Sequence, residues 1–515
     1  MYVVTFYSFK GGVGRSMSLV NVGVQLAQSG QKVLLVDFDL EAPGLPTFSL
    51  NKPQEDIPGI VEYVSQYVAT GESPDVARFI YESERFESGG SICVMPAGRQ
   101  DGTYSHRLNS IDWPRLYSEH SGYLFFEDLL RQWAESIAPD YVLIDSRTGH
   151  SDVEGICTRQ LPNAVCLLFF PNEQNLNGLR KIVANINADN LQSSNKKITV
   201  HFAVSNVPDL DDEDGILGNT MGKFRQELGY KELAAEIHHY NSLSLLNQEI
   251  FSLIRPNSRL TKEYKVLTKS ITKNNLGDRE AVISILKSAN RDLKEVMDED
   301  GPQGLQQKIE TIRKNFPQDG EICFRVALIL EQLGSSRDAL SLLSNEVVDE
   351  SYSTASMFAK RARLNHRLGY ETEAVNDLRA MLDADRADVF SMLEAIPTIE
   401  MLAPGLYDRI PDSKAFRSLP EKDQLFFALR SEGNDKQMRA NVAILRHLRS
   451  SKINKSGEED FLNHRLALAS IGAKEFVTAI EILLPAGEGG REFSITDSFN
   501  LAMAIWGRDG TVQKS

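Results

Sequence analysis

The stretch "SFKGGVGRSMSL", residues 8–19, decides how the first half of this chain folds. It follows a short apolar run and opens a stretch with helical periodicity that starts near Ser16. A strand, a glycine-rich loop and a helix in this order form the context of a phosphate-binding loop. Gly11, Gly12 and Gly14 can turn backbone N–H groups inward, and the helix adds the positive end of its dipole. The stretch therefore predicts an anion site.

The composition is that of a globular protein with more than one domain. The chain has 515 residues, of which 42% are hydrophobic and 25% charged, and no apolar run approaches the roughly 18 residues that a membrane span needs. Its formal net charge of −15 disfavours broad attraction to nucleic acid or anionic membranes. Four scattered cysteines, without a C-x-x-C pair, indicate isolated thiols. The first residues lack the features of a signal peptide, so we expect a cytoplasmic protein with no membrane partner.

Residues 1–275 alternate short β-branched runs with amphipathic stretches. This alternation predicts an α/β domain with a mainly parallel sheet that helices cover on both faces. We expect strands at residues 3–8, 32–37, 92–95, 141–145, 164–170 and 198–205.

After residue 275 the β-rich runs stop. We expect a linker with a helix at 276–302 and an all-α domain of helical repeats at 303–515. Gly334 and Gly369 are 35 residues apart (369 − 334 = 35), as are Gly472 and Gly507 (507 − 472 = 35), close to the period of about 34 in tetratricopeptide repeats. The resemblance to those repeats rests on small residues and spacing, because most of their Trp and Tyr positions are absent here. It implies stacked helix pairs that bind a protein partner.

With Lys10 at its start, the loop KGGVGRS resembles the K-G-G-x-G-K-[ST] loop of the MinD/ParA class of P-loop ATPases. Further motifs of that class follow in the expected order. LLVDFDLEAPG matches the first switch segment with Asp37 and Asp39, and DSRTG matches the second with Asp145 and Gly149. The resemblance covers roughly the first half of the chain and implies a P-loop NTPase domain.

The resemblance also implies ATP and Mg²⁺ as cofactors and a role for each matching position. Asp39 would orient the attacking water, and Lys10 would cross to the phosphates of a second copy, so that ATP lies between the two chains of a homodimer. Together with Arg15, these two residues are the expected catalytic group. Magnesium would be held by Ser16, Asp37 and Asp145. The expected nucleotide contacts are Gly11, Gly12, Val13, Gly14, Arg15, Ser16, Met17, Gly149, Asn206 and Pro208, the last two at the adenine.

Arg15 departs from the class, which has lysine at this position. A guanidinium keeps the positive charge beside the β- and γ-phosphates and can clamp two oxygens, but it is longer and bulkier than an ammonium. We therefore expect nucleotide binding with slow ATP hydrolysis. In the alternative, Arg15 leaves a scaffold that binds nucleotide structurally or not at all. Arg147, where the class usually has proline, would contact the γ-phosphate or a partner subunit, or else form a surface ion pair with a neighbour such as Asp152.

A basic helix face near the end of the first domain raises a third alternative, a DNA-partition ATPase. Because the whole chain is acidic, a solvated face or a docking surface is the preferred interpretation. The residues of this basic face are Arg255, Arg259, Lys262, Lys269 and Lys273. The leading hypothesis is an ATP-dependent dimeric switch with partner-binding repeats, of the kind found in bacterial signalling or phage defence.

Overall fold

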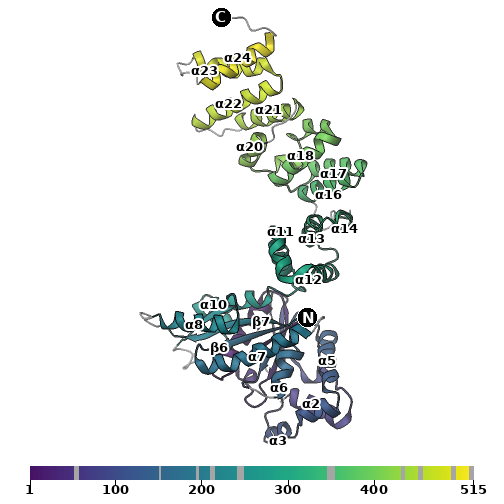
Figure 1. Ribbon diagram of the computed structural model, residues 1–515, viewed down its shortest axis with the longest axis vertical. Coiled ribbons are helices and arrows are strands. Elements are labelled where there is room, and N and C mark those ends of the chain that lie inside the picture. The colour runs from purple at the N-terminus through teal and green to yellow at the C-terminus, as the bar shows by residue number, and fades with distance from the viewer. Residues whose placement is uncertain are drawn as a thin grey trace. The chain divides into compact units, whose positions relative to one another are not determined.

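The computed structural model divides the chain into two compact units, Met1–Ile285 and Leu286–Ser515 (Figure 1). It describes all residues except 51–56, 150–151, 193–196, 209–214, 241–248, 345–353, 431–434, 451–455, 489–494 and 510–515. Each unit is considered by itself below.

The first unit is built on an eight-stranded sheet with the order β3-β4-β2-β5-β1-β6-β7-β8. All neighbouring strands are parallel except β3 and β4, which are antiparallel. The predicted α/β class with a mainly parallel sheet is thus confirmed. The strands are β1 (Tyr2–Tyr7), β2 (Lys32–Phe38), β3 (Tyr81–Arg85), β4 (Ser91–Met95), β5 (Tyr141–Ser146), β6 (Ala164–Phe169), β7 (Thr199–Val207) and β8 (Ala235–His238).

Side chains of the central strands alternate between two apolar cores, as the two-residue period of a strand requires. In β1, Val4 and Phe6 belong to the core under the first helix, whereas Val3 and Tyr7 face the opposite side. Helices α1 and α10 cover the first face, and α5 and α7 cover parts of the second. Buried on both faces, these strands read as continuous apolar runs.

Helices connect the strands and carry the loops of the site. Figure 1 shows α7, α8 and α10 beside β6 and β7. The α-helices of this unit, including α11 at its border, are α1 (Arg15–Gln28), α2 (Ile60–Thr70), α3 (Tyr104–Asn109), α4 (Trp113–Glu119), α5 (Gly122–Gln132), α6 (Asp152–Gly155), α7 (Glu173–Gln192), α8 (Ile216–Leu228), α9 (Phe251–Ile254), α10 (Arg259–Thr272) and α11 (Arg279–Arg291).

The regular elements that the structure describes in the second unit are all helices. Successive helices pack against each other in pairs, such as α16 with α17, α21 with α22 and α23 with α24 (Figure 1). The assignment to tetratricopeptide repeats stays a prediction. The helices are α12 (Leu293–Asn315), α13 (Gly320–Gln332), α14 (Ser336–Leu342), α16 (Ala355–Arg367), α17 (Glu371–Asp383), α18 (Val389–Leu402), α19 (Lys414–Arg417), α20 (Glu421–Arg430), α21 (Asp435–Ser450), α22 (Ser456–Gly472), α23 (Phe476–Glu488) and α24 (Ile495–Asp509).

The 35-residue glycine spacing predicted from the sequence marks left-handed helix ends for the pair Gly334 and Gly369, but not for the pair Gly472 and Gly507. Gly334 and Gly369 follow α13 and α16 with φ of 82° and 86°, the left-handed cap that glycine favours. After α22 the corresponding left-handed residue is Lys474, with a φ of 63°. It lies 105 residues after Gly369 (474 − 369 = 105), which is three times the 35-residue spacing. Gly507 lies inside α24, where a Cβ atom would come within 2.3 Å of the Phe476 ring. Close packing, not capping, explains that glycine.

Among the described residues, no helix combines the length and the apolar character that crossing a membrane requires. The four cysteines are free thiols, and three of them are buried.

Candidate nucleotide-binding site

The glycine loop joins β1 to α1 and opens into a cavity at the carboxyl end of the sheet. Gly12 and Gly14 adopt left-handed angles, with φ of 79° and 75°, and Gly14 caps α1 without a side-chain hydrogen bond. The first amides of α1 are therefore left for a ligand, which is how a helix N-terminus binds phosphate. The cavity measures about 490 Å³. It is lined by Ser8, Gly11, Gly12, Gly14, Arg15, Ser16, Met17, Asp39, Glu41, Ala42, Gly44, Phe48, Arg147 and Thr148.

Arg15 bridges the end of β5 and the segment that follows β2. Its Nε donates to Asp145 Oδ1 and its Nη2 donates to Asp39 Oδ2, while Nη1 lies 3.5 Å from Ser8 Oγ. The Arg15 side chain is only 7% exposed, and that of Asp145 is fully buried. Burial alone would lower the pKa of the guanidinium, but the two carboxylates reverse this and raise it. The side chain is thus a fixed cation that links the loop to both aspartates.

The carboxylates at this edge are held in unlike environments. Asp37 pairs in register with Asp145 and accepts hydrogen bonds from the backbone N–H groups of Asp39, at 3.1 Å, and Leu45, at 3.2 Å. Burial, together with the charge of Asp145, raises the pKa of Asp37 well above its usual value. Burial also raises the pKa of Asp39, although Arg15 opposes it. Asp37 therefore shapes the segment after β2, and Asp39 faces the cavity.

The donor set is compatible with a hydrated magnesium ion. Ser16 lines the cavity, and among the described residues Asp145 Oδ2 is a buried oxygen that has no hydrogen-bond partner. Hydroxyl and carboxylate oxygens are the ligands that Mg²⁺ prefers, with water completing its shell. Both carboxylate oxygens of Asp37 already accept backbone hydrogen bonds, so its predicted role as a ligand has less support in the geometry than those of Ser16 and Asp145.

Four other predicted site residues lie in the loop or beside it. Lys10 is exposed, and its Nζ lies 5.5 Å from the centroid of the Phe9 ring. Asn206 adopts a φ of 55° and donates from Nδ2 to Gly12 O at 2.7 Å. Val13 is buried, and Pro208, just after β7, is half-buried. None of these four predicted residues lines the cavity itself.

Two residues of the second switch segment contact different parts of the site, Gly149 the end of β1 and Arg147 the cavity wall. Gly149 has a φ of 75°, and its carbonyl oxygen accepts from the Tyr7 hydroxyl at 3.1 Å. Arg147 lines the cavity and places Nη1 2.5 Å from Glu41 Oε1. An ion pair of Arg147 thus exists, with Glu41 as its partner, whereas the side chain of Asp152 lies outside the described residues.

The predicted basic face is partly neutralised. Arg259 pairs with Glu263 at 3.1 Å, Lys273 pairs with Glu232 at 2.6 Å, and Arg255 lies 5.8 Å from the Phe251 ring centroid. Lys262 and Lys269 are exposed on α10. The face therefore carries less net charge than the sequence pattern indicates.

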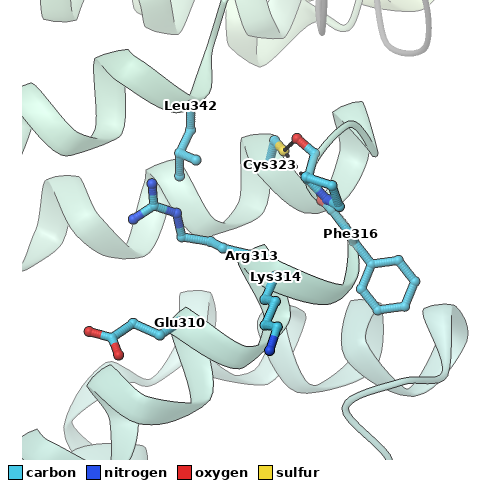
Figure 2. A pocket seen from close by; sticks show the side chains of 7 residues that line it. Glu310, Arg313, Lys314, Phe316, Cys323 and Leu342 are labelled. Carbon is cyan, nitrogen blue, oxygen red and sulfur yellow. Dashed lines mark hydrogen bonds between the residues drawn. The ribbon is translucent and has the colours of Figure 1, made fainter.

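A second cavity, of about 340 Å³, lies in the helical unit between α12, α13 and α14 (Figure 2). Cys323 Sγ lies 3.8 Å from Phe316 O and 3.6 Å from Pro317 O, and burial raises the pKa of this thiol. Figure 2 shows Glu310 and Lys314 projecting from α12 away from the sulfur. Burial thus disfavours the thiolate form of Cys323, which fits a structural role.

Sequence reasoning missed several residues that support the site, among them Tyr7, Ser205 and Glu41. Ser205 Oγ donates to Val13 O at 2.7 Å and so fixes the loop from β7. Its signal is a hydroxyl near the carboxyl end of a strand, directly before Asn206. The role of Glu41 could not be predicted from the sequence, because an exposed acidic residue two positions after Asp39 is ordinary in a loop.

Comparisons with known proteins match the first half of the chain. The family model for the CobQ/CobB/MinD/ParA nucleotide binding domain matches residues 4–275. The septum site-determining protein MinD of Helicobacter pylori is 55% identical over 38 residues, which are 7% of this chain and 14% of that protein. The cytosolic Fe-S cluster assembly factor CFD1 of Yarrowia lipolytica is 28% identical over 150 residues, 29% of this chain and 43% of that protein. The chain thus spans less than half the length of the curated relatives it matches.

Solved structures match the first half of the chain at low identity. The MinC:MinD cell division complex of Aquifex aeolicus is 18% identical with a TM-score of 0.38, covering 53% of this chain and 97% of that one. MinD of Pyrococcus horikoshii, complexed with Mg-ADP, is 16% identical with a TM-score of 0.37, covering 53% and 96%.

The glycine loop between β1 and α1, at the carboxyl edge of a parallel sheet, defines a P-loop nucleotide-binding domain. Because the family model spans more than half of the chain, the chain belongs to the CobQ/CobB/MinD/ParA nucleotide binding domain family. The resemblance of the first half of the chain to the MinD/ParA class, predicted from the sequence, is thus confirmed for the nucleotide-binding domain.

Proposed function

We propose that this protein is an ATP-binding switch that hydrolyses ATP slowly and whose nucleotide state controls a homodimer. The observation that carries the proposal is the Arg15 bridge, because one buried cation joins the phosphate loop to Asp39 and Asp145. A triphosphate that attracts the guanidinium draws it away from both carboxylates. The segments after β2 and β5 then respond together to an arriving or departing phosphate.

Each residue of the site has a separate role in this proposal. The loop amides and Arg15 bind and orient the phosphates, and Ser16 with Asp145 would hold a hydrated Mg²⁺. When bound, the metal neutralises charge on the β- and γ-phosphate oxygens. Asp39, once released by Arg15, is free to accept a hydrogen bond from the attacking water. Turnover is slow in this proposal because Asp39 and the phosphates compete for the same guanidinium.

The repeats of the second unit are proposed to bind a protein partner, and a role in bacterial signalling or phage defence is compatible with that arrangement. We infer a cytoplasmic setting from the same proposal. The relatives include a MinD solved with MinC, so a protein partner has a precedent among proteins of similar fold.

One observation favours a second candidate, a nucleotide-binding scaffold without catalysis. Two of the three guanidinium nitrogens of Arg15 already donate to carboxylates. If ATP does not displace these bonds, the loop cannot use the cation. A ParA-like DNA-binding ATPase is less favoured, because Arg259 and Lys273 of the basic face are already paired.

The test uses the full chain with radiolabelled ATP and Mg²⁺. We expect ATP binding, slow phosphate release, and loss of that release in Asp39→Ala with binding retained. Arg85→Gln, which removes an exposed pair with Glu82 far from the cavity, is the matched control and keeps both activities. Binding without release in the unaltered chain selects the nucleotide-binding scaffold. No binding at millimolar ATP rejects both the switch and the nucleotide-binding scaffold, and leaves a scaffold that binds no nucleotide.

A further inference from the structure

The ion pair of Arg147 and Glu41 joins two segments across the mouth of the cavity. Arg147 Nη1 lies 2.5 Å from Glu41 Oε1, and the side chains are 33% and 57% exposed. Both residues line the same cavity as the glycine loop. The pair is therefore part of the cavity wall and is open to solvent.

In this structure Arg147 and Arg15, the two arginines of the cavity, each contact a carboxylate. Arg15 is buried against Asp39 and Asp145, whereas Arg147 contacts Glu41 at the surface. Exposed ion pairs contribute little to stability, because water screens them and both side chains lose freedom. A guanidinium binds phosphate oxygens more strongly, often through two parallel hydrogen bonds. A phosphate that reaches Arg147 will therefore displace Glu41.

The order of the strands shows which phosphate can reach it. The loop follows β1, Arg147 follows β5 and Glu41 follows β2, and these strands are neighbours in the order β2-β5-β1. The predicted adenine contact Asn206 lies on β7, on the opposite side of β1 from β5 and β2. A nucleotide whose base lies at Asn206 and whose phosphates bind the loop amides over β1 therefore extends toward β5 and β2 at its last phosphate. The last phosphate is thus the group nearest to Arg147.

We propose that Arg147 is the residue by which this site distinguishes a nucleoside triphosphate from a diphosphate, with Glu41 occupying the guanidinium until the terminal phosphate arrives. The inference rests on the proposed nucleotide binding and adds to it a specificity determinant. Glu41 acts as a competitor for the terminal phosphate. Its removal strengthens triphosphate binding and leaves diphosphate binding unchanged.

The experiment measures the affinities of the full chain for a non-hydrolysable ATP analogue and for ADP, each with Mg²⁺, by titration calorimetry. Arg147→Gln weakens binding of the analogue about tenfold and changes ADP binding less than twofold, as expected for the loss of one charge-assisted contact. Glu41→Gln strengthens binding of the analogue by about twofold to fivefold. Arg85→Gln removes a comparable exposed pair outside the cavity and changes neither affinity.

The outcomes separate this inference from the function on which it rests. If the unaltered chain binds both nucleotides but Arg147→Gln weakens them equally, or neither, the selectivity role is wrong while the proposed function stands. A weakened or unchanged affinity of Glu41→Gln for the analogue overturns the competitor role of that residue. Absence of binding in the unaltered chain overturns the proposed function and the inference together. Thermal unfolding of each variant shows that these exposed substitutions leave the fold intact.

Discussion

Arg15 is the residue on which both stability and function of the site depend. Its partner Asp145 is fully buried, so removing the cation leaves a buried charge without compensation. Arg15→Gln is expected to lower the free energy of unfolding of the first unit by about 3–5 kcal/mol. Arg15→Lys should lower the free energy of unfolding by less than Arg15→Gln does, because it keeps the positive charge. It should still be destabilising, because one ammonium cannot reach both carboxylates.

Urea unfolding without nucleotide measures this difference through the transition midpoint of the first unit. Arg85→Gln, at an exposed pair, serves as the control and should shift the free energy by less than about 1 kcal/mol. Equal stability of Arg15→Gln and the unaltered chain would show that the bridge contributes nothing in solution.

His201 is expected to make the stability of the first unit sensitive to acid. It lies buried in β7, and among the described residues its Nε2 has no hydrogen-bond partner. Burial, with a smaller effect of Lys273, lowers its pKa to about 4. Between pH 6.5 and 4 the unfolded chain therefore binds a proton that the folded chain excludes, and stability falls as the pH falls, by about 3 kcal/mol in all.

The variant His201→Leu is expected to remove most of this pH dependence, because leucine has no proton to bind. The measurement is the urea midpoint at pH 7.5 and at pH 5. His106→Leu, at an exposed histidine, is the control and should keep the slope of the unaltered chain. A slope that persists in His201→Leu assigns the acid sensitivity to other groups.

At the scale of elements, helix α7 fixes the start of the phosphate loop through one close contact. A Cβ atom on Gly178 would come within 2.1 Å of Phe9 Cγ, so only glycine lets the ring lie there. Gly178→Ala forces Phe9 to move and is expected to cost about 1–3 kcal/mol, as overpacking does. Differential scanning calorimetry should show a lower unfolding temperature for the first unit.

Gly222→Ala in α8 is the matched control, since nothing lies within 4 Å of its added Cβ atom. There, alanine should raise stability by about 0.5–1 kcal/mol, because it favours the helix more than glycine does. Phe9→Leu should partly rescue Gly178→Ala if the clash is the cause. No rescue would locate the strain elsewhere.

The sequence predicted those elements whose side chains repeat a simple period. Six apolar runs became β1, β2, β4, β5, β6 and β7, because strands buried on both faces need continuous apolar residues. The edge strands β3 and β8 were missed, since Tyr81–Arg85 is mostly polar and Ala235–His238 has only four residues. Edge strands such as these pair on one side only, so they need fewer apolar residues and their sequence pattern is weak.

The same limit applies to the site. The left-handed backbone of Gly12 and Gly14 could be predicted, because glycine adopts positive φ without steric cost and the loop pattern is local in sequence. The direction of the Arg15 guanidinium could not, because Asp39 and Asp145 lie 24 and 130 residues away in sequence. Spacing identifies which residues gather at a sheet edge, but only the fold shows which of them pair.

At the scale of the whole molecule, the proposed switch requires two chains, and Lys10 is the residue that tests this. Lys10 is exposed at the loop, where its ammonium lies over the Phe9 ring rather than in the cavity of its own chain. Asp39→Ala should trap the ATP-bound state, since it removes the proposed water-orienting group and a competitor for Arg15. With saturating ATP and Mg²⁺, light scattering should then give twice the monomer mass. Adding Lys10→Ala should restore the monomer while ATP remains bound, whereas adding Lys262→Ala, at an exposed lysine of α10, should leave the dimer intact. A monomeric Asp39→Ala chain with bound ATP would exclude the nucleotide-dependent dimer.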